Sequence, residues 1–327
     1  MSIILIGDLH LNNWKQFSTI LPNGLNSRLA DQMRVVGRIA NILTDNDIVI
    51  FLGDLIDSYG ASLDKVIYNA AFHTLKTWAK RCKHLYVLVG NHDQYRLINV
   101  LSSFDEIENV TIVSSTIKKE IDEYIVDMVP WEGELPNIKG DIFVGHVMPI
   151  GAVLGIYTSK KGDEGVPIRY FDGYRYVVSG HIHEPQDLFV PDSETVVTCL
   201  GSVMQLNLSS SSQARFMLKL EKNKLIKIPI ESPKIYISII NSQEEADAFV
   251  KEHDPGYYKL IVMDYRIKFP PLDHTVVIEY EAKPTIGKRG IEDVKEMDLM
   301  EIINEFIDNV NTKIDKIVAK ELIDKLQ

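Results

Sequence analysis

Five times along this chain, a run of apolar residues rich in β-branched side chains ends in glycine and is followed at once by polar residues. The polar residues can bind metal ions or transfer protons, and they lie in Gly7-Asp8-Leu9-His10, Gly53-Asp54, Gly90-Asn91-His92-Asp93, Gly145-His146 and Gly180-His181-Ile182-His183. Glycine lets the backbone turn sharply as it leaves a strand. The pattern therefore predicts polar groups delivered together at the carboxyl edge of a buried sheet.

The spacing of the apolar residues predicts how strands and helices alternate. Strands are expected at 2–6, 48–52 and 85–89, and apolar residues at helical spacing predict helices over 27–43 and 63–82. These βα units imply parallel strands that are buried on both faces. After about residue 110 the strands are short and closely spaced, which predicts a second sheet packed on the first; they are expected at 110–113, 124–129, 141–144, 175–179, 195–200 and 215–220.

The rest of the chain predicts two smaller parts. Strands at 234–240, 259–263 and 275–280, with Ser242 and Glu245 as a helix capping box, indicate a small α+β unit. From Gly290 the apolar spacing indicates two amphipathic helices, which either fold back or await a partner. We expect an α/β fold in which two mixed sheets form a sandwich flanked by helices, divided into domains 1–230, 231–285 and 286–327.

Composition narrows the class of protein. The chain of 327 residues carries a formal net charge of −11, which argues against a broad basic face that holds nucleic acid. No apolar run approaches the ~20 residues of a membrane helix, so we expect no membrane association and a cytoplasmic protein, or one of the host cytoplasm if phage-encoded. Cys82 and Cys199 are expected to be small buried hydrophobes.

Basic pairs could supply a local patch for a phosphodiester substrate. The candidates are Lys118 with Lys119, Lys160 with Lys161, and Arg169 with Arg175. Ordinary solvated surface residues are the competing interpretation for each pair.

Histidines are concentrated in the strand-end segments. Five of the nine histidines lie there, whereas His73, His84, His253 and His274 are read as structural or surface residues. The segments supply carboxylate, amide and imidazole ligands from Asp8, His10, Asp54, Asn91, His146, His181 and His183, with His92 left over. Such a set without thiolates suits Mn²⁺, Fe²⁺ or Zn²⁺ rather than Ca²⁺. Seven ligands fit two ions with one bridging carboxylate, an arrangement that lowers the pKa of a bridging water and binds phosphate oxygens.

The segments resemble the signature of calcineurin-like metallophosphoesterases, D-x-H, G-D-x-x-D, G-N-H-D, G-H and G-H-x-H in that order. Within that superfamily the chain is similar to SbcD-type nuclease subunits of DNA repair. It looks closest to the short recombination endonuclease subunits of tailed bacteriophages, which share Val129-Pro130-Trp131, the V-x-S-G-H-x-H form of 177–183 and the following Gly201-Ser202. The motif resemblance covers roughly residues 2–220.

The resemblance implies a role for each site residue. It puts Asp8, His10 and His183 on one metal ion and Asn91, His146 and His181 on the other, with Asp54 bridging and Mn²⁺ as the expected metal. His92 would protonate the leaving oxygen as general acid, and Asp93 would orient its imidazole. The implied activities are 3′ to 5′ exonuclease on double-stranded DNA and endonuclease on single strands. One position departs from cellular relatives, which often have a histidine where this chain has Asp57.

The resemblance also implies partners besides DNA. The sequence contains no G-x-x-x-x-G-K-[ST] phosphate loop, so ATP hydrolysis would belong to an SMC-like SbcC-type ATPase held by the C-terminal helices. The small domain would cap DNA. A homodimer through 63–82 and 95–104 is implied, although core packing explains most of the same apolar residues.

Two other classes of protein remain as alternatives. One is a different metallophosphoesterase, either a small-molecule phosphodiesterase or a phosphatase. Protein phosphatases of the superfamily carry G-D-x-x-D-R-G and G-N-H-E, whereas this chain has Ser58-Tyr59 after Asp57 and Asp93 after His92. The other is a non-catalytic scaffold, a class that usually lacks some ligands.

Overall fold

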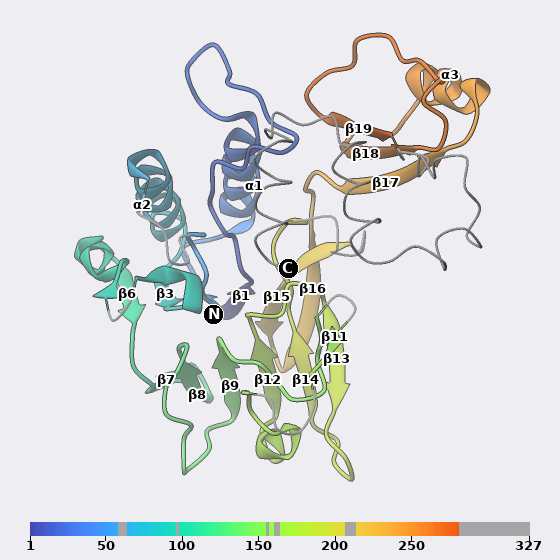
Figure 1. Cartoon of the computed structure of the whole chain (residues 1–327). Helices are drawn as coiled ribbons and strands as arrows, with labels where there is room; N and C mark the ends of the chain where they lie inside the picture. The colour runs from blue at the N-terminus through green and yellow to red at the C-terminus, as the bar shows by residue number, and fades with distance from the viewer. Residues whose placement is uncertain (58–63, 96–97, 155–156, 160–163, 207–213, 281–327) are drawn as a thin grey trace, which may run out of the picture. The chain divides into compact units, whose positions relative to one another are not determined.

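The computed structural model describes residues 1–57, 64–95, 98–154, 157–159, 164–206 and 214–280. These residues form two six-stranded sheets, one three-stranded sheet and two short ribbons (Figure 1). The expected tail helices within 286–327 and the pair Lys160 and Lys161 lie outside the described residues. The mixed α/β fold with two large sheets confirms the predicted fold class.

The first sheet has the strand order β16-β15-β1-β2-β3-β6. Its strands are β1 (Ser2–Ile6), β2 (Asp47–Phe51), β3 (His84–Leu88), β6 (Val110–Val113), β15 (Arg215–Glu221) and β16 (Lys224–Ile230). β1, β2 and β3 run parallel, as the βα units predict. β6 also runs parallel to β3, and β15 pairs antiparallel with β1. The parallel strands therefore end at one edge.

The second sheet has the strand order β13-β14-β12-β9-β8-β7. Its strands are β7 (Ile117–Ile121), β8 (Tyr124–Val129), β9 (Ile142–Gly145), β12 (Tyr176–Ser179), β13 (Gln186–Phe189) and β14 (Val196–Cys199). The assignment of 110–113 and 215–220 to this sheet was wrong, because both strands hydrogen-bond to the first sheet. Apolar alternation reveals a strand but does not identify the neighbour with which it pairs.

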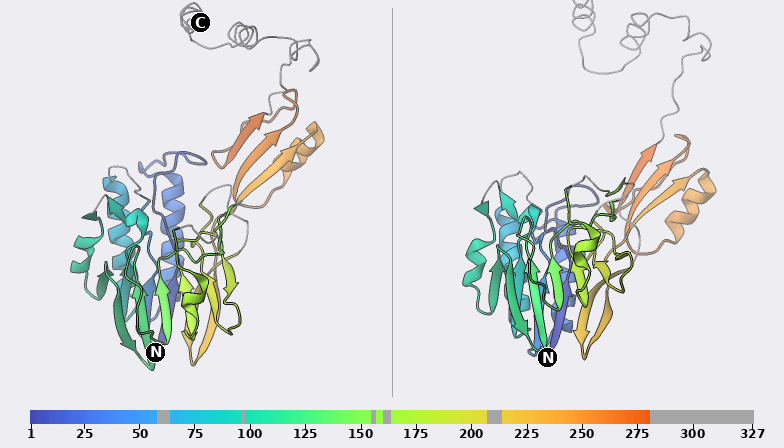
Figure 2. Two further views of the ribbon diagram at one scale, coloured as in Figure 1. Left: turned by 60° about the horizontal axis from the view of Figure 1, so that its bottom comes forward. Right: turned by 90° about the horizontal axis from the view of Figure 1, so that it is seen from below.

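Two helices connect the strands of the first sheet. Helix α1 (Ser27–Ile42) begins at Asn26, whose side chain accepts hydrogen bonds from two backbone N–H groups of the first turn. Helix α2 (Lys65–Ala79) begins at Asp64 in the same way. Both agree with the predicted helices to within a few residues, and Figure 2 shows them together beside the strands that they connect.

The core is divided between the faces of the two sheets. One cluster lies on the helix side of the first sheet, where Trp78 of α2 packs near Phe51 of β2 with ring centroids 5.7 Å apart. A second cluster lies between the sheets and joins residues such as Leu5 and Val144. A third covers the far side of the second sheet around Phe143 and Phe171. Burial on both faces holds the two sheets as one sandwich.

The smaller sheet joins β17 (Ile235–Ile240), β18 (Tyr257–Val262) and β19 (Val276–Tyr280), in that order. Helix α3 (Gln243–Lys251) begins at the predicted cap, Ser242, whose side chain accepts from the N–H of Glu245. Its Ala246 belongs to an apolar cluster with Leu260 of β18. The unit therefore has a small core of its own.

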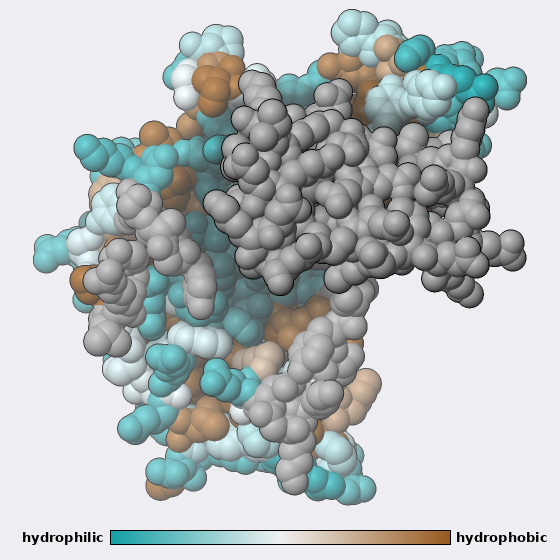
Figure 3. Space-filling view, viewed as in Figure 1, coloured by the Kyte–Doolittle hydropathy of each residue, from teal (hydrophilic) through white to brown (hydrophobic). Residues whose placement is uncertain are grey.

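The remaining elements are short. They are the 3₁₀ helices η1 (Asn91–Asp93), η2 (Ser102–Glu106) and η3 (Ile168–Phe171), and the two-residue strands β4 (Gln94–Tyr95), β5 (Ile98–Asn99), β10 (Val153–Leu154) and β11 (Tyr157–Thr158). Cys82 and Cys199 are free and buried, as expected. Within the described chain, no helix has both the length and the apolar character needed to cross a membrane. On the face in Figure 3, hydrophilic side chains cover much of the described surface and apolar side chains form smaller patches.

Candidate metal centre

The predicted site residues follow strands of both large sheets. Asp8, Asp54 and Asn91 come after β1, β2 and β3 of the first sheet, and His146 and His181 come after β9 and β12 of the second. Within each sheet these strands are parallel, so their carboxyl ends share an edge. The packing of the sheets brings the two edges together, because side chains from one sheet contact those from the other.

Glycine is required in these turns because atoms of neighbouring residues occupy the space that a Cβ atom would fill. A Cβ atom on Gly90 would lie 2.1 Å from Oδ1 of Asp54 and 2.4 Å from its backbone nitrogen. Gly53 has a positive φ of 106°, and a Cβ there would lie 2.6 Å from Nδ1 of His146. The glycines therefore allow neighbouring strand ends to converge on Asp54 and His146.

We expect Gly90→Ala to destabilise the fold by about 1–3 kcal/mol, because the added methyl group would overlap the backbone and side chain of Asp54. Urea unfolding measures the difference. The control is Gly37→Ala in α1, where a Cβ atom meets nothing within 4 Å. Alanine should stabilise that helix by about 0.5–1 kcal/mol. Equal stability of the two variants would contradict the close approach at Gly90.

Three site residues have left-handed backbone conformations. The φ angles of His10, Asp54 and His181 are 50°, 54° and 71°. Non-glycine residues in this region cost of order 1–3 kcal/mol each, and they persist where the surrounding structure holds them. At His10 and Asp54 the surroundings are backbone hydrogen bonds, because the N–H groups of Leu9 and His10 both donate to the carbonyl of Asp54.

The first group of donors comprises Asp8, His10, Asp54 and His183. Nε2 of His10 lies 3.3 Å from Oδ2 of Asp54 and 4.0 Å from Oδ2 of Asp8. Nε2 of His183 lies 3.9 Å from the same oxygen of Asp8. The backbone N–H of His181 donates to Oδ2 of Asp8 at 3.0 Å and so fixes that carboxylate. These four side chains could hold one divalent cation.

The second group shares Asp54 with the first and adds His146 and His181. Nε2 of His146 lies 3.3 Å from Oδ2 of Asp54. Oδ1 of Asn91 lies 3.0 Å from Nε2 of His146 and 3.0 Å from Nδ1 of His181. The Nδ1 atom of His146 contacts the carbonyl of Leu52 at 2.7 Å, which leaves Nε2 facing the other donors. These side chains could hold a second cation, with Asp54 common to both.

Two buried polar atoms at the centre fit bound metal. Nε2 of His10 and Oδ2 of Asp54 are buried and make no hydrogen bond, although they lie 3.3 Å apart. Leaving such atoms without a partner costs about 1–3 kcal/mol each. A divalent cation between the two groups would satisfy both atoms, and the donor chemistry suits Mn²⁺, Fe²⁺ or Zn²⁺.

Charge and burial set the protonation states of the metal-free site. Burial opposes ionisation of Asp54, but the imidazoles of His146 and His10 hold the pKa of that carboxyl well below its usual range. Burial lowers the pKa of His146, but the Asp54 carboxylate outweighs it and raises the pKa to about 9. Burial, with the positive charge of His146, lowers the pKa of His181 to about 4, and burial next to His10 lowers that of His183 to about 3.

We expect metal binding to release protons at neutral pH from His146 and His10. A ligating imidazole must be neutral, and in the metal-free site the Asp54 carboxylate outweighs burial and raises the pKa of both groups, that of His146 to about 9. Mn²⁺ affinity should therefore rise from neutral pH towards this pKa and level off above it. Calorimetric titrations in two buffers of different ionisation enthalpy measure the released protons. No release at neutral pH would show that His146 is already neutral.

The structure gives Asp57 a contact that we expected for Asp93. Nδ1 of His92 lies 2.8 Å from Oδ1 of Asp57. The two carboxylate oxygens of Asp93 instead accept the backbone N–H groups of Ile56 and Gly90, at 3.1 and 3.0 Å. Asp93 is fully buried, and burial raises its pKa to about 7. The carboxylate positioned to orient His92 is therefore Asp57, and Asp93 fastens the turn that carries His92.

Other residues at the site were not singled out from the sequence. Nε2 of Gln32 in α1 donates to the carbonyls of Leu9 and His10, at 3.1 and 2.8 Å. Arg215 of β15 donates to the carbonyl of His183. Trp131 packs beside His181, with ring centroids 4.8 Å apart. Of these three residues, only Trp131 lies in a segment that carries the family resemblance, Val129-Pro130-Trp131.

Three residues of the expected basic patch have partners within the protein. Lys118 forms an ion pair with the buried Asp127, and Arg169 pairs with Asp192 at 3.0 Å. The guanidinium of Arg175 lies over the rings of Tyr124 and Tyr176. These contacts favour structural roles for the three residues.

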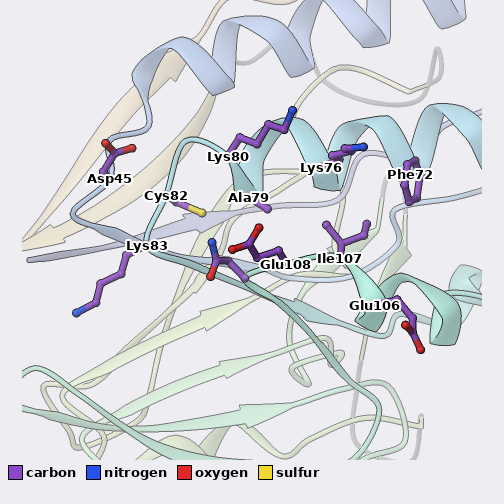
Figure 4. A pocket seen from close by; sticks show the side chains of 11 residues that line it. Asp45, Phe72, Lys76, Ala79, Lys80, Cys82, Lys83, Glu106, Ile107 and Glu108 are labelled. Atoms are coloured by element: carbon purple, nitrogen blue, oxygen red, sulfur yellow. The ribbon is translucent and has the colours of Figure 1, made fainter.

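A separate hollow of about 700 Å³ lies near the amino end of β3, away from the donor groups. Figure 4 shows it between α2 and the segment before β6, with Lys76, Lys80 and Lys83 alongside Asp45, Glu106 and Glu108. Charges of both signs line the hollow, so its electrostatics select no particular ligand.

The sandwich fold and the carboxylate and imidazole donors define a metal-dependent phosphoester hydrolase. The chain belongs to the calcineurin-like phosphoesterase family, whose model matches residues 1–185. Among solved structures, the phosphopantetheinyl hydrolase PptH of Mycobacterium tuberculosis matches with 13% identity and a TM-score of 0.35, over 62% of this chain and 89% of that one. That score is too low to bear on function. No curated protein matches the sequence.

Proposed function

We propose that this protein is a metal-dependent DNA nuclease, the nuclease subunit of an SbcCD-like repair or recombination complex. One observation supports the proposed hydrolytic activity above all. Two groups of metal donors share Asp54, and His92 lies beside them. The DNA part rests on the resemblance of the strand-end motifs and the 129–131 segment to SbcD-type and phage subunits. The proposed activities are 3′ to 5′ exonuclease on duplex DNA and endonuclease on single strands.

In the proposed centre, Asp8, His10 and His183 would hold one divalent cation, and Asn91, His146 and His181 would hold the other, with Asp54 common to both groups and Mn²⁺ as the proposed metal. Two bound divalent cations would activate water as nucleophile and neutralise the charge of the phosphodiester. The protein holds its donors in place through second contacts, such as that between His146 and the carbonyl of Leu52 at 2.7 Å.

His92 is the proposed general acid. Its backbone N–H donates to Oδ1 of Asp54 at 2.8 Å, which places the side chain next to the centre. Its ring contacts Asp57 through Nδ1, so Nε2 is the nitrogen that can give a proton to the leaving oxygen. Asn12 in turn donates to Oδ2 of Asp57 at 2.8 Å. The carboxylate is therefore held from both sides while it orients the imidazole.

We expect Asp57→Asn to lower kcat at saturating Mn²⁺ about 10–100-fold, because second contacts to an acting imidazole are typically worth this much. Mn²⁺ affinity should fall as well, since the same Oδ1 of Asp57 lies 3.9 Å from Nδ1 of the proposed ligand His10. Hydrolysis rates and calorimetric titration give the two quantities. The control is Asp93→Asn, which keeps one acceptor oxygen but turns an NH₂ group towards the other backbone N–H, so this variant should lower stability instead. A larger kcat loss in the Asp93 variant would return the orienting role to Asp93.

The partners follow the same proposal. Residues 231–285 would cap DNA, and the C-terminal helices within 286–327 would hold an SMC-like SbcC-type ATPase. Dimerisation through 63–82 and 95–104 competes with core packing, since Ile67 and Leu75 of α2 are buried against the first sheet. The alternatives are another phosphoesterase specificity or a scaffold. The presence of every donor in the motif set favours a catalyst over a scaffold.

Hydrolysis of an end-labelled DNA duplex with Mn²⁺ tests the proposal, with Asp54→Ala as the inactive variant. Release of nucleotides from the 3′ end by the intact chain, lost in the variant, supports the nuclease. Activity on bis(p-nitrophenyl) phosphate without cleavage of duplex or single-stranded DNA would contradict it and point to another phosphodiester substrate.

A further inference from the structure

We propose that Trp131 is a stacking platform for the nucleobase next to the scissile phosphate. This role rests on the proposed nuclease function and deepens it. Trp131 follows β8 and is half-buried. Its indole ring is tilted against the imidazole of His181, with centroids 4.8 Å apart and planes at 31°. It meets the ring of His146 edge-on at 6.1 Å.

Trp131 lies on the side of the candidate metal centre that is accessible to solvent. Asp8, His10, Asp54 and His146 are buried, whereas Asn91, His92, His181 and His183 are only partly buried. A phosphodiester must therefore approach past the second set, and Trp131 packs against His181 of that set. The ring of Trp131 therefore lies beside a proposed ligand that a bound phosphodiester would reach.

The backbone around Trp131 is firmly held. The N–H of Trp131 donates to the carbonyl of Val89 at 2.9 Å, which ties the loop to the end of β3 just before Gly90. The N–H of Gly133 donates back to Pro130 at 3.0 Å, and Thr116 donates to the carbonyl of Glu134 at 2.7 Å. The turn is also crowded, because a Cβ on Gly133 would lie 2.8 Å from both Pro130 and Thr116. A ring on such a support is already oriented before substrate binds.

Stacking would supply affinity that charge does not. The chain has a net charge of −11, and Lys118 and Arg169 are engaged in ion pairs. A platform that uses the π-face of a base is sequence-tolerant and gains binding energy without a basic groove. It would also favour an unpaired base at the site, because a base within a duplex is already stacked on its neighbours.

The competing role for Trp131 is to position His181 only. Comparison of DNA with an oligonucleotide that is abasic at both nucleotides flanking the cleaved bond separates the two roles, because that substrate keeps the phosphodiester but offers no ring to stack on Trp131. For Trp131→Leu we expect kcat/KM on single-stranded DNA to fall roughly 10- to 100-fold, the range for loss of one stacked base. Hydrolysis of the doubly abasic substrate and Mn²⁺ binding should fall much less, and Trp131→Phe should recover most of the loss on DNA.

An oligonucleotide with one abasic position beside the cleaved bond completes a double-mutant cycle. The missing base should slow the intact chain as much as Trp131→Leu does and should add nothing in that variant. Equal losses on DNA and the doubly abasic substrate, or additive effects of variant and abasic site, would overturn the stacking role. If the intact chain hydrolyses bis(p-nitrophenyl) phosphate but no DNA, the nuclease proposal fails first and the stacking role with it.

Discussion

Replacing His92 by glutamine should reduce turnover of a phosphodiester by ~10²–10⁴-fold, because glutamine cannot act as general acid. Metal binding should persist, since His92 is absent from the two donor groups that share Asp54. Its backbone hydrogen bond to Asp54, at 2.8 Å, does not depend on the side chain. Single-turnover hydrolysis and calorimetric Mn²⁺ titration measure the two properties on the same preparation.

The control is His73→Gln, an exposed position in α2 outside the donor groups. It should leave turnover and metal binding unchanged. Loss of metal in the His92 variant would identify His92 as a ligand, together with His10 and Asp57, whose donor atoms also lie close to it. A leaving group with a low pKa needs no proton, so p-nitrophenyl esters should be less affected than DNA.

Replacing Asp54 by asparagine should remove most of the activity and most of the stabilisation by Mn²⁺. The side chain keeps its size, but the negative charge shared by both donor groups is lost. In the unaltered chain, Mn²⁺ at about 100 times its dissociation constant should raise the free energy of unfolding by about 2.7 kcal/mol, because the ion binds only the folded state. Thermal unfolding with and without Mn²⁺ measures this stabilisation.

The matched control is Asp192→Asn, an exposed carboxylate that pairs with Arg169. Exposed ion pairs contribute about 0–1 kcal/mol, so this variant should retain both activity and the response to Mn²⁺. Without metal, Asp54→Asn should have two opposing effects on the free energy of unfolding. It removes the attraction to His10 and His146, and it also removes a buried carboxylate oxygen that makes no hydrogen bond. An unchanged Mn²⁺ response in the Asp54 variant would contradict the shared position of this residue.

Local patterns in the sequence predict the parallel βα part of the fold and the residues that end its strands. A short apolar run that ends at glycine, such as Ile3-Ile4-Leu5-Ile6, predicts a buried strand, and apolar residues at helical spacing predict the helix over 27–43. The glycine before Asp8, Asp54 and Asn91 indicates a sharp turn, and the turn fixes which side chains reach the edge. These are local properties, so a single sequence is enough to predict them.

The way in which the strand ends meet depends on the packing of the folded chain. Strand β15 follows strands of the second sheet along the chain, yet it pairs with β1 of the first sheet. The pairing depends on backbone hydrogen bonds between distant segments, which apolar alternation does not encode. Asp57 and Asp93 are the same residue type and each belongs to a strand-end motif, but their burial and partners differ. Asp57 contacts His92, and Asp93 accepts backbone N–H groups. Which carboxylate orients the imidazole is therefore set by the packing of one turn against another.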